Sequence, residues 1–461
     1  AKTGDGVAVA QGALEPPGGG KDQIVALAAA QLVIAGSAEH PVVAVAALDH
    51  VIAAESAERA IAALMAVPDH ADDASRTARV RAVLAAADTG DREVVAAYLS
   101  EHGAEWYAAL GGAGLSTPTW PREHGGLGLA PRAAGGVADA VNRYGVGRGM
   151  EDFVGLVLAG PTIIEHGTEA QKARYLGPLA RGEERWCQLF SEPGAGSDLA
   201  ALSTRAVRQE DGSWRVQGQK VWNSFAHVSD FGILMARTDP TLPKHRGISY
   251  FLVDMRTPGV EARPLRQMTG DAEFNEVFLT DAVLPPDALL GEVNDGWRVA
   301  ITTLMQERNG LTGKPAVGPG RADELVARAR VTGTWEDPVL RDDLARFLVE
   351  ERALQMLTMR SYAETGRGAV GAEGSIRKLV NAGLQETAGH LAALVEPVDA
   401  LAWDTAEATS RAAFEFLEMK QTSIAGGTSE IQRNIIAERV LGMPKDPDPD
   451  KGVPFNERTT R

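Results

Sequence analysis

Cysteine is almost absent from this chain, since Cys187 is the single one among 461 residues. One thiol excludes a framework of internal disulfides and is typical of a reducing compartment, so we expect a cytoplasmic location. Cys187 lies in an apolar run, which predicts an inert, buried thiol. No spacing of histidines and cysteines matches a metal site, and no metal is expected.

Long hydrophobic runs are also lacking. The longest candidate, residues 24–35, is too short for a membrane span and lacks the basic flank and early position of a secretory signal. Basic residues are in the minority: 46 Lys and Arg stand against 62 Asp and Glu, a net charge of -16. This balance disfavours nucleic acid and anionic membranes as partners. It still allows an anionic coenzyme, which a local basic pocket can bind.

The texture of the sequence changes along the chain and predicts an α+β fold. Helical patterns come first, short apolar runs between turns follow, and long amphipathic helices end the chain. The expected segments are a flexible leader (1–21), an extra Ala-rich helical segment (22–74), an N-terminal helical domain (75–186), a small middle β domain (187–290), a C-terminal helical bundle (291–445) and a disordered tail (446–461). The Ala-rich segment is interpreted as an added helical hairpin or an element that docks a partner.

Turn-forming residues predict where these domains are interrupted. In the N-terminal domain we expect a loop at residues 120–129 and two short helices between residues 160 and 178. His124 and His166 lack a carboxylate or nucleophile at a suggestive spacing, so hydrogen bonding is favoured over catalysis. In the β domain, apolar runs bounded by Gly, Asp and Pro predict strands at residues 214–216, 231–237, 248–253 and 276–279.

Two segments of the β domain carry the most chemical information. Residues 191–198 read Ser-Glu-Pro-Gly-Ala-Gly-Ser-Asp, and residues 218–224 read Gly-Gln-Lys-Val-Trp-Asn-Ser. An aromatic plane beside hydroxyl and amide donors is suited to a flat, electron-poor heteroaromatic ring. Simpler interpretations remain open, because Gly-Ala-Gly-Ser is a common tight turn and Trp222 fits a buried strand position.

Taken together, the two segments closely resemble the flavin-binding middle domain of the acyl-CoA dehydrogenase family, and the resemblance covers about residues 75–445. It implies FAD as the cofactor and an acyl-CoA as the substrate. In the family, the residue matching Trp222 lies against the flavin ring, and the residue matching Ser224 donates a hydroxyl near the reactive ring nitrogen. The other residues that the resemblance assigns are Phe190, Ser191 and Asn223 to the flavin and Ser197 to the acyl-CoA arm.

A second match lies at residues 424–439, which resemble the loop and final helix of the family's bundle. Gly426 and Gly427 allow the backbone to approach a ligand closely. The polar residues that follow are suited to cap the next helix, and capping alone explains them. The resemblance implies in addition that the segment contacts the cofactor and that a backbone N–H binds the thioester carbonyl, which acidifies the α C–H. The residues concerned are Thr428, Ser429 and Glu430, with both glycines on the substrate side.

The catalytic base is not at the commoner position of the family. Many members have a glutamate where this chain has Gly426, and glycine cannot take a proton. Members with a displaced base, such as isovaleryl- and long-chain-type enzymes, resemble this chain at Glu307-Arg308, which implies that Glu307 is the base. Arg308 then orients the carboxylate or holds the substrate, with a structural ion pair as the alternative. Without the resemblance, Glu307 reads as an exposed carboxylate on a helix.

Two motifs of the family are missing. Members carry Arg-x-x-Phe-Gly early in the bundle and Gln-x-x-Gly-Gly-x-Gly later, where they hold the pyrophosphate and adenosine of the neighbouring subunit's flavin. The corresponding residues 330–338 and 394–401 match neither motif. The chain in this respect resembles actinobacterial steroid acyl-CoA dehydrogenases built from unlike subunits. We therefore expect a hetero-oligomer with a second acyl-CoA dehydrogenase-like subunit, with a homo-oligomer as the alternative.

The predicted function is FAD-dependent α,β-dehydrogenation of an acyl-CoA thioester to a trans-2-enoyl-CoA, with an electron-transfer flavoprotein as the acceptor. A bulky, branched or steroid-derived acyl group is favoured by the displaced base and the missing motifs. Two alternatives remain open. One is a non-catalytic subunit that completes a partner's flavin site, and the other is a fold relative with different flavin chemistry, such as monooxygenation.

Overall fold

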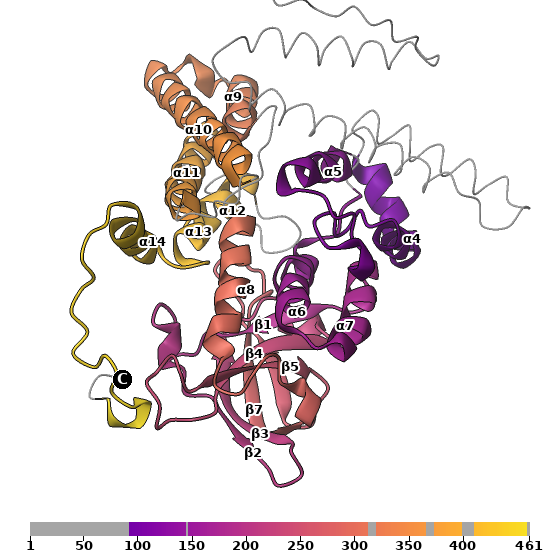
Figure 1. Cartoon of the computed structure of the whole chain (residues 1–461). Coiled ribbons are helices and arrows are strands. Elements are labelled where there is room, and N and C mark those ends of the chain that lie inside the picture. The colour runs from indigo at the N-terminus through magenta and orange to yellow at the C-terminus, as the bar shows by residue number, and fades with distance from the viewer. Residues whose placement is uncertain (1–91, 144–145, 312–319, 366–372, 399–409, 459–461) are drawn as a thin grey trace, which may run out of the picture.

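The computed structural model describes residues 92–143, 146–311, 320–365, 373–398 and 410–458 (Figure 1). Helices come first in the described chain, a mixed sheet follows and helices return, so the α+β prediction is confirmed. The expected leader (1–21) and Ala-rich segment (22–74) lie outside the described residues. Among the described residues, no helix is both long and apolar enough to cross a bilayer.

The N-terminal helices are α4 (Arg92–Gly112), α5 (Pro131–Arg143), α6 (Gly160–His166) and α7 (Glu169–Arg181). The predicted loop at residues 120–129 is confirmed and contains a short 3-10 turn. The two predicted short helices are α6 and α7, although α7 continues beyond Pro178. Thr168 fixes the start of α7, because its hydroxyl accepts a hydrogen bond from the Gln171 N–H while the Thr168 N–H donates one to the Gln171 side-chain oxygen.

A seven-stranded sheet forms the middle of the chain. Its strands are β1 (Trp186–Leu189), β2 (Arg205–Arg208), β3 (Trp214–Val221), β4 (Phe231–Arg237), β5 (Ile248–Asp254), β6 (Val260–Pro264) and β7 (Asn275–Leu284). Their order is β1-β4-β2-β3-β7-β6, and β5 also pairs with β4. The β1–β4 and β2–β4 pairs are parallel and the others antiparallel. The four predicted strands are confirmed as β3, β4, β5 and β7, while β1, β2 and β6 were not predicted.

Alternation along the strands gives the sheet two apolar faces. On one face, Trp186, Ile233 and Tyr250 pack with side chains of α6, α7 and α8. On the other face, Cys187 and Phe251 belong to a second core made within the β domain. Burial raises the pKa of the Cys187 thiol to about 12, so the prediction of an inert, buried cysteine is confirmed.

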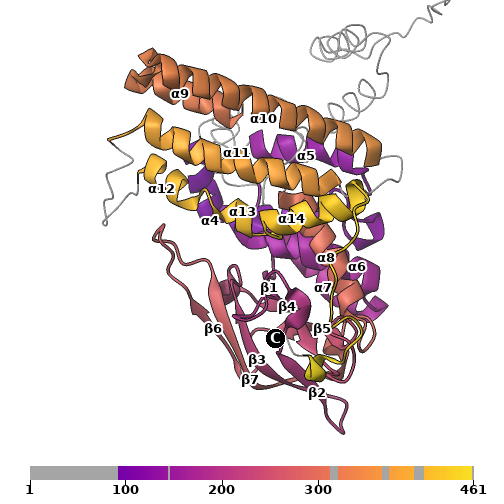
Figure 2. The ribbon, with the colours of Figure 1, turned by 90° about the vertical axis from the view of Figure 1, so that its left-hand side faces the viewer.

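The C-terminal helices are α8 (Gly296–Leu311), α9 (Arg321–Thr332), α10 (Pro338–Thr365), α11 (Glu373–Val395), α12 (Arg411–Glu418), α13 (Gln421–Ile424) and α14 (Ser429–Ile435). Helix α8 runs from the sheet up to the other helices, while α9, α10 and α11 form a layer above the β domain (Figure 2). Leu325, Leu344, Phe347 and Leu391 are part of the core that joins this layer. Because α8 belongs to both the sheet core and the bundle, it can carry a side chain to their junction.

The predicted disorder of the tail does not hold for residues 446–458. The Phe455 N–H donates to the Leu242 carbonyl at 3.0 Å, and the Asn456 N–H donates to the Pro240 carbonyl at 3.1 Å. The Phe455 ring lies 3.5 Å from the Arg237 guanidinium. The Pro- and Asp-rich composition indicated disorder, but such residues also form turns whose backbone groups find partners on a neighbouring loop.

Candidate active site

The end of β1 is attached to the end of β3. The Phe190 carbonyl accepts a hydrogen bond from the Lys220 ammonium at 3.0 Å, and the Ser191 carbonyl accepts one from the Val221 N–H at 2.9 Å. The Phe190 ring is buried and meets the Tyr250 ring edge-on at 5.7 Å between centroids. These contacts fix the backbone that opens the Ser-Glu-Pro-Gly-Ala-Gly-Ser-Asp loop.

Glu192 anchors that loop from inside the protein. Its carboxylate accepts hydrogen bonds from the Ser203 N–H (2.7 Å) and hydroxyl (2.8 Å), the Thr204 N–H (2.9 Å) and the Lys220 ammonium (2.8 Å). Burial alone would raise the pKa of Glu192, but the charge of Lys220 and the hydrogen bonds lower it to about 2. Glu192 is therefore a carboxylate held in place and not an acid available for proton transfer.

The outer side of the loop faces open space. Glu192 and Ala195 exchange two backbone hydrogen bonds of 3.0 Å, which close a tight turn. No atom lies within 4 Å of the place that a Cβ would take on Gly194 or Gly196. Ser197, which follows, is exposed. Small residues and a hydroxyl are thus accessible here to a ligand.

Trp222 presents its indole to solvent. The side chain is 62% exposed, so the interpretation of Trp222 as a core residue is wrong. Its φ of 62° lies in the left-handed region, which is rare for a bulky residue and occurs most often where function requires it. The edge of the Phe274 ring supports the indole at 6.0 Å between centroids, and Ser224 is half-buried two residues further on.

Asn223 points the other way. Its side chain is 1% exposed and donates a hydrogen bond of 2.7 Å to the Gln188 carbonyl on β1. Its backbone carbonyl accepts a hydrogen bond of 2.8 Å from the Asn275 side chain. Asn223 therefore fixes the segment that carries Trp222 and Ser224, and its own amide lies inside the protein.

Helix α8 places Glu307 beside β1. The Glu307 carboxylate is half-buried, and its Oε2 lies 3.5 Å from the Gln188 Nε2. Gln188 precedes Phe190 by two residues, so the carboxylate lies near the strand that leads into the loop of small residues. Arg308 is on the same helix, but its side chain lies outside the described part of the structure.

Buried hydroxyls set the position of α8. The Thr303 hydroxyl lies 2.9 Å from the Thr162 hydroxyl of α6 and 3.0 Å from the Tyr250 hydroxyl of β5. One residue earlier, the Thr302 hydroxyl lies 2.8 Å from Nε2 of His166. His166 thus makes the kind of hydrogen bond that its sequence context favoured. Because these contacts cross three elements, a shift of α8 along its axis would break them together.

The loop before α14 has the left-handed backbone conformation that its two glycines allow. Gly426 and Gly427 have φ values of 64° and 86°. The Thr428 hydroxyl accepts a hydrogen bond from the Ile431 N–H at 3.3 Å, so the predicted helix cap is confirmed. Glu430 is exposed in the first turn of α14, where its charge suits the helix dipole.

Three residues near these segments were not expected from the sequence. Gln188 contacts Glu307 and Asn223, while Lys378 and Gln432 bind the carbonyls of the glycine loop. Lys378 and Gln432 are buried polar side chains at apolar-facing positions of α11 and α14. A polar residue on the apolar face of an amphipathic helix is a signal that the sequence does contain.

Family models match three consecutive parts of the chain. The N-terminal domain of acyl-CoA dehydrogenases matches residues 78–183, the middle domain matches residues 187–282 and the C-terminal domain matches residues 294–441. The fold and site thus define a flavoenzyme acting on acyl thioesters. The chain belongs to the acyl-CoA dehydrogenase family. The six segment boundaries expected from the sequence stay predictions.

Two relatives from Mycobacterium tuberculosis are similar over most of this chain. The chain is 44% identical to acyl-CoA dehydrogenase FadE34 over 340 residues, or 73% of this chain, but it spans only 46% of that protein's length. It is 41% identical to acyl-CoA dehydrogenase IpdE1 over 355 residues, covering 74% of this chain and 88% of the relative.

Solved structures show the same fold. The Tcur3481-Tcur3483 steroid acyl-CoA dehydrogenase has a TM-score of 0.65 at 30% identity, covering 75% of this chain and 90% of that one. The ChsE4-ChsE5 complex from Mycobacterium tuberculosis has a TM-score of 0.65 at 26% identity, covering 86% of this chain and 98% of that one.

The family is FAD-dependent, and the residues of this chain fit that cofactor. The exposed indole of Trp222 offers a flat apolar face, and the Ser224 hydroxyl lies two residues away. The open side of Gly194 and Gly196 leaves room for a bulky group next to the loop. An aromatic plane, a hydroxyl donor and free space together suit an isoalloxazine.

Proposed function

We propose that this chain oxidises an acyl-CoA thioester between its α and β carbons, with Glu307 as the base. The observation that supports this most is the placement of Glu307 beside Gln188 of β1, in a chain whose alternative base position is Gly426. When bound, FAD supplies the redox capacity by accepting a hydride. Glu307 takes the α-proton, and a backbone N–H at Gly426 binds the thioester carbonyl so that this proton becomes more acidic.

The cofactor contacts are part of the same proposal. The segments that would hold the flavin follow β1, follow β3 and begin α14, and Asn223 acts by positioning its neighbours. The assigned residues are Phe190, Ser191, Trp222, Asn223, Ser224, Thr428, Ser429 and Glu430. On the substrate side, Ser197 would contact the acyl-CoA arm, Arg308 the carboxylate or substrate, and Gly426 and Gly427 the thioester. Substrate binding would exclude water around Glu307 and strengthen it as a base.

Replacing Glu307 by Gln tests the assignment of the base. Glu307→Gln should retain FAD, because the matched cofactor residues are elsewhere, and should lose at least about 100-fold in activity for want of a proton acceptor. The readouts are the flavin absorbance of the purified protein and its anaerobic bleaching by short, branched and steroidal acyl-CoA thioesters. Asp342→Asn is the control, since Asp342 is an exposed carboxylate on α10 that pairs with Arg346 of the same helix. Bleaching by Glu307→Gln at the wild-type rate would refute the assignment.

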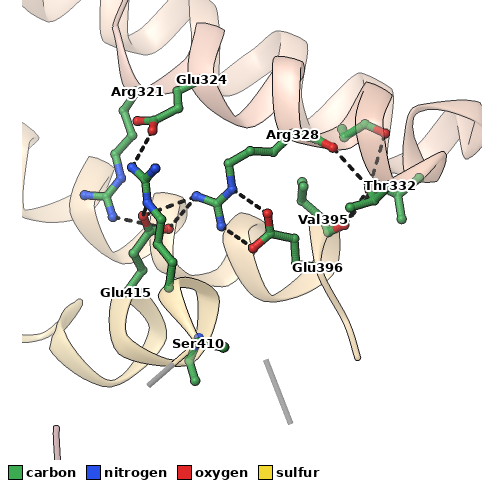
Figure 3. Close-up of polar contacts among 12 residues, drawn as sticks. Arg321, Glu324, Arg328, Thr332, Val395, Glu396, Ser410 and Glu415 are labelled. Carbon is green, nitrogen blue, oxygen red and sulfur yellow. Dashed lines mark hydrogen bonds and ion pairs between the residues drawn. The ribbon is translucent and has the colours of Figure 1, made fainter. Parts of the chain in front are cut away.

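A second, acyl-CoA dehydrogenase-like subunit is proposed as the partner. In relatives, residues matching 330–338 and 394–401 would serve a neighbour's cofactor. Here Glu396 of that second stretch binds Arg328 through two hydrogen bonds of 2.8 and 2.7 Å, and Glu415 binds the same guanidinium at 3.0 Å (Figure 3). The Glu396 and Glu415 carboxylates pair with Arg328, so its charge is already neutralised. Their own negative charges would repel a pyrophosphate. The names of the similar solved structures, a two-component steroid enzyme and a complex, support the same proposal.

The proposal includes a bulky, branched or steroid-derived acyl group, an electron-transfer flavoprotein as acceptor and a cytoplasmic location. The steroid class is supported by the name of the Tcur3481-Tcur3483 enzyme. The location is supported by the single, reduced and buried Cys187. The panel of acyl-CoA thioesters also tests the acyl group, because the best substrate bleaches the flavin fastest.

A further inference from the structure

Lys378 is a buried lysine next to the proposed site. It lies on α11, is 0% exposed and donates a hydrogen bond of 2.7 Å to the Gly427 carbonyl. Burial lowers the pKa of Lys378, and the negative charges of Glu307 and Glu430 oppose that effect. An ammonium group is rarely buried without a partner. This one has a backbone carbonyl on one side and two carboxylates within electrostatic reach.

The hydrogen bond from Lys378 is one of several that hold a turn made of two glycines. Gly426 and Gly427 have no side chains to restrict their backbone, and both have positive φ values. The Gln432 amide donates to the Gly426 carbonyl at 3.1 Å and to the Gly427 carbonyl at 3.2 Å. Lys378 and Gln432 thus hold two successive carbonyls from the side of the protein core. Because the N–H of a trans peptide points away from its carbonyl, the N–H groups of Gly427 and Thr428, which share these two peptides, are fixed in direction too. The backbone that begins at Gly426 is held with them.

Helix α11 brings the two parts of the site together. It packs against α14, which follows the glycine turn, and against α8, which carries Glu307 (Figure 2). The Lys378 ammonium therefore contacts the turn directly and acts on Glu307 through its charge. The charged groups that face it are Glu307 from α8 and Glu430 from α14.

We propose that Lys378 is a positioning residue that orients the Gly426-Gly427 turn toward the thioester carbonyl and keeps Glu307 ionised as a base. This inference rests on the proposed function. It assigns two effects to one side chain: binding of the carbonyl oxygen should depend on Lys378, and so should the pH at which Glu307 loses its charge.

A pair of ligands separates the first effect from general damage. The probes are a trans-2-enoyl-CoA, which has the carbonyl, and the S-alkyl-CoA thioether of the same carbon skeleton, which lacks it. Lys378→Met should weaken enoyl-CoA binding by about 10-fold, the value of one good hydrogen bond, and leave thioether binding unchanged. Lys378→Arg, which keeps the charge and the donors, should recover part of the loss. Lys420→Met, at the surface of the same bundle, is the matched control.

The pH dependence of kcat/KM tests the second effect. Loss of a nearby positive charge raises the pKa of a carboxylate, so the acid limb of Lys378→Met should move to higher pH. An unmoved acid limb, or equal losses for enoyl-CoA and thioether, would overturn the role of Lys378. Failure of the proposed function would look different: Glu307→Gln would then stay active, whatever the two ligands show for Lys378→Met.

Discussion

At the scale of single residues, conformation separates those that face a ligand from those that support them. Trp222 and Asn223 are neighbours in the chain, yet the indole is largely exposed and the amide is buried. The positive φ of Trp222 turns the chain sharply after β3 and produces this division. Asn223 keeps the turn in place through Gln188 and Asn275. The strain of Trp222 is thus maintained by hydrogen bonds that hold the next residue.

The Glu192–Lys220 pair predicts how the loop responds to acid. The pKa of Glu192 is lowered to about 2 in the folded protein, below its ordinary value of 4.5, so its stabilising effect is complete above pH 4.5 and disappears as the pH falls toward 2. Glu192→Gln should lower the midpoint of urea unfolding at pH 7 and reduce the loss of stability between pH 5 and about pH 3. A steeper loss in the variant than in the wild type would contradict this view.

Sequence alone separated these roles only in part. It singled out the loop, Trp222, Ser224 and Glu307, because their types and spacing match a family pattern, and their roles stay predictions. It could not show that Asn223 points inward, since alternation along a strand fails where a residue adopts a positive φ. Lys378 was missed although its place among the apolar positions of a helix is a signal in the sequence, because a lysine can also reach solvent from such a position and only packing shows that it is buried.

At the scale of elements, α8 is the part on which the geometry of the proposed base depends. The hydroxyls of Thr162, Tyr250 and Thr303 join α6, β5 and α8 in one buried group. Thr303 lies one turn before Glu307 on α8. Because the helix backbone between them is rigid, the contacts of Thr303 also determine where the Glu307 carboxylate lies.

Thr303→Val tests this dependence. The change keeps the volume but leaves the Thr162 and Tyr250 hydroxyls short of a partner, so the free energy of unfolding should fall by about 1–3 kcal/mol. Activity should fall more than FAD content, because Glu307 moves relative to β1 while Trp222 stays in place. Thermal unfolding, flavin absorbance and kcat measure the three effects, with Thr332→Val on α9 as a control. Equal losses of activity and FAD would show that α8 has no separate role.

The strands show where sequence patterns are sufficient. β4 and β5 were predicted within one residue, because each is a continuous apolar run that is buried on both faces. β1, β2 and β6 have four or five residues each and mix polar with apolar positions, so their pairing partners define them more than their own residues do. The prediction of a disordered tail was wrong for a similar reason, because the hydrogen-bond partners of the tail lie on a loop that is distant in the sequence.

At the scale of the whole molecule, the segments expected to bind the flavin ring differ from the stretches expected to bind a neighbouring subunit's pyrophosphate and adenosine. The β domain contains the segments proposed to bind the ring. In the stretch that would serve a neighbour, Glu396 is hydrogen-bonded to Arg328, which also binds Glu415. Arg321 adds a further ion pair to Glu415 (Figure 3), and Arg411 adds another. These ion pairs join helices of the bundle, so we interpret the cluster as a structural element of the bundle.

Purification alone and with a second acyl-CoA dehydrogenase-like subunit tests the assembly. We expect the lone chain to hold little FAD and the mixed complex to hold FAD and oxidise acyl-CoA, because the unlike subunit would supply the missing contacts. Light scattering and the ratio of flavin to protein give the composition. Full flavin occupancy and activity in the lone chain would favour a homo-oligomer. Glu396→Gln should not raise FAD content in the lone chain, because Glu415 still occupies Arg328.

The buried thiol of Cys187 has a practical consequence for following that assembly. Because the chain contains no other cysteine, and this one is shielded from reagents, a cysteine introduced at an exposed position would be the unique point of attachment for a maleimide dye. Val349 on α10 is 68% exposed, lies outside residues 330–338 and suits the purpose. A dye at that position would report association with another subunit by fluorescence anisotropy, without removing any native residue of the site.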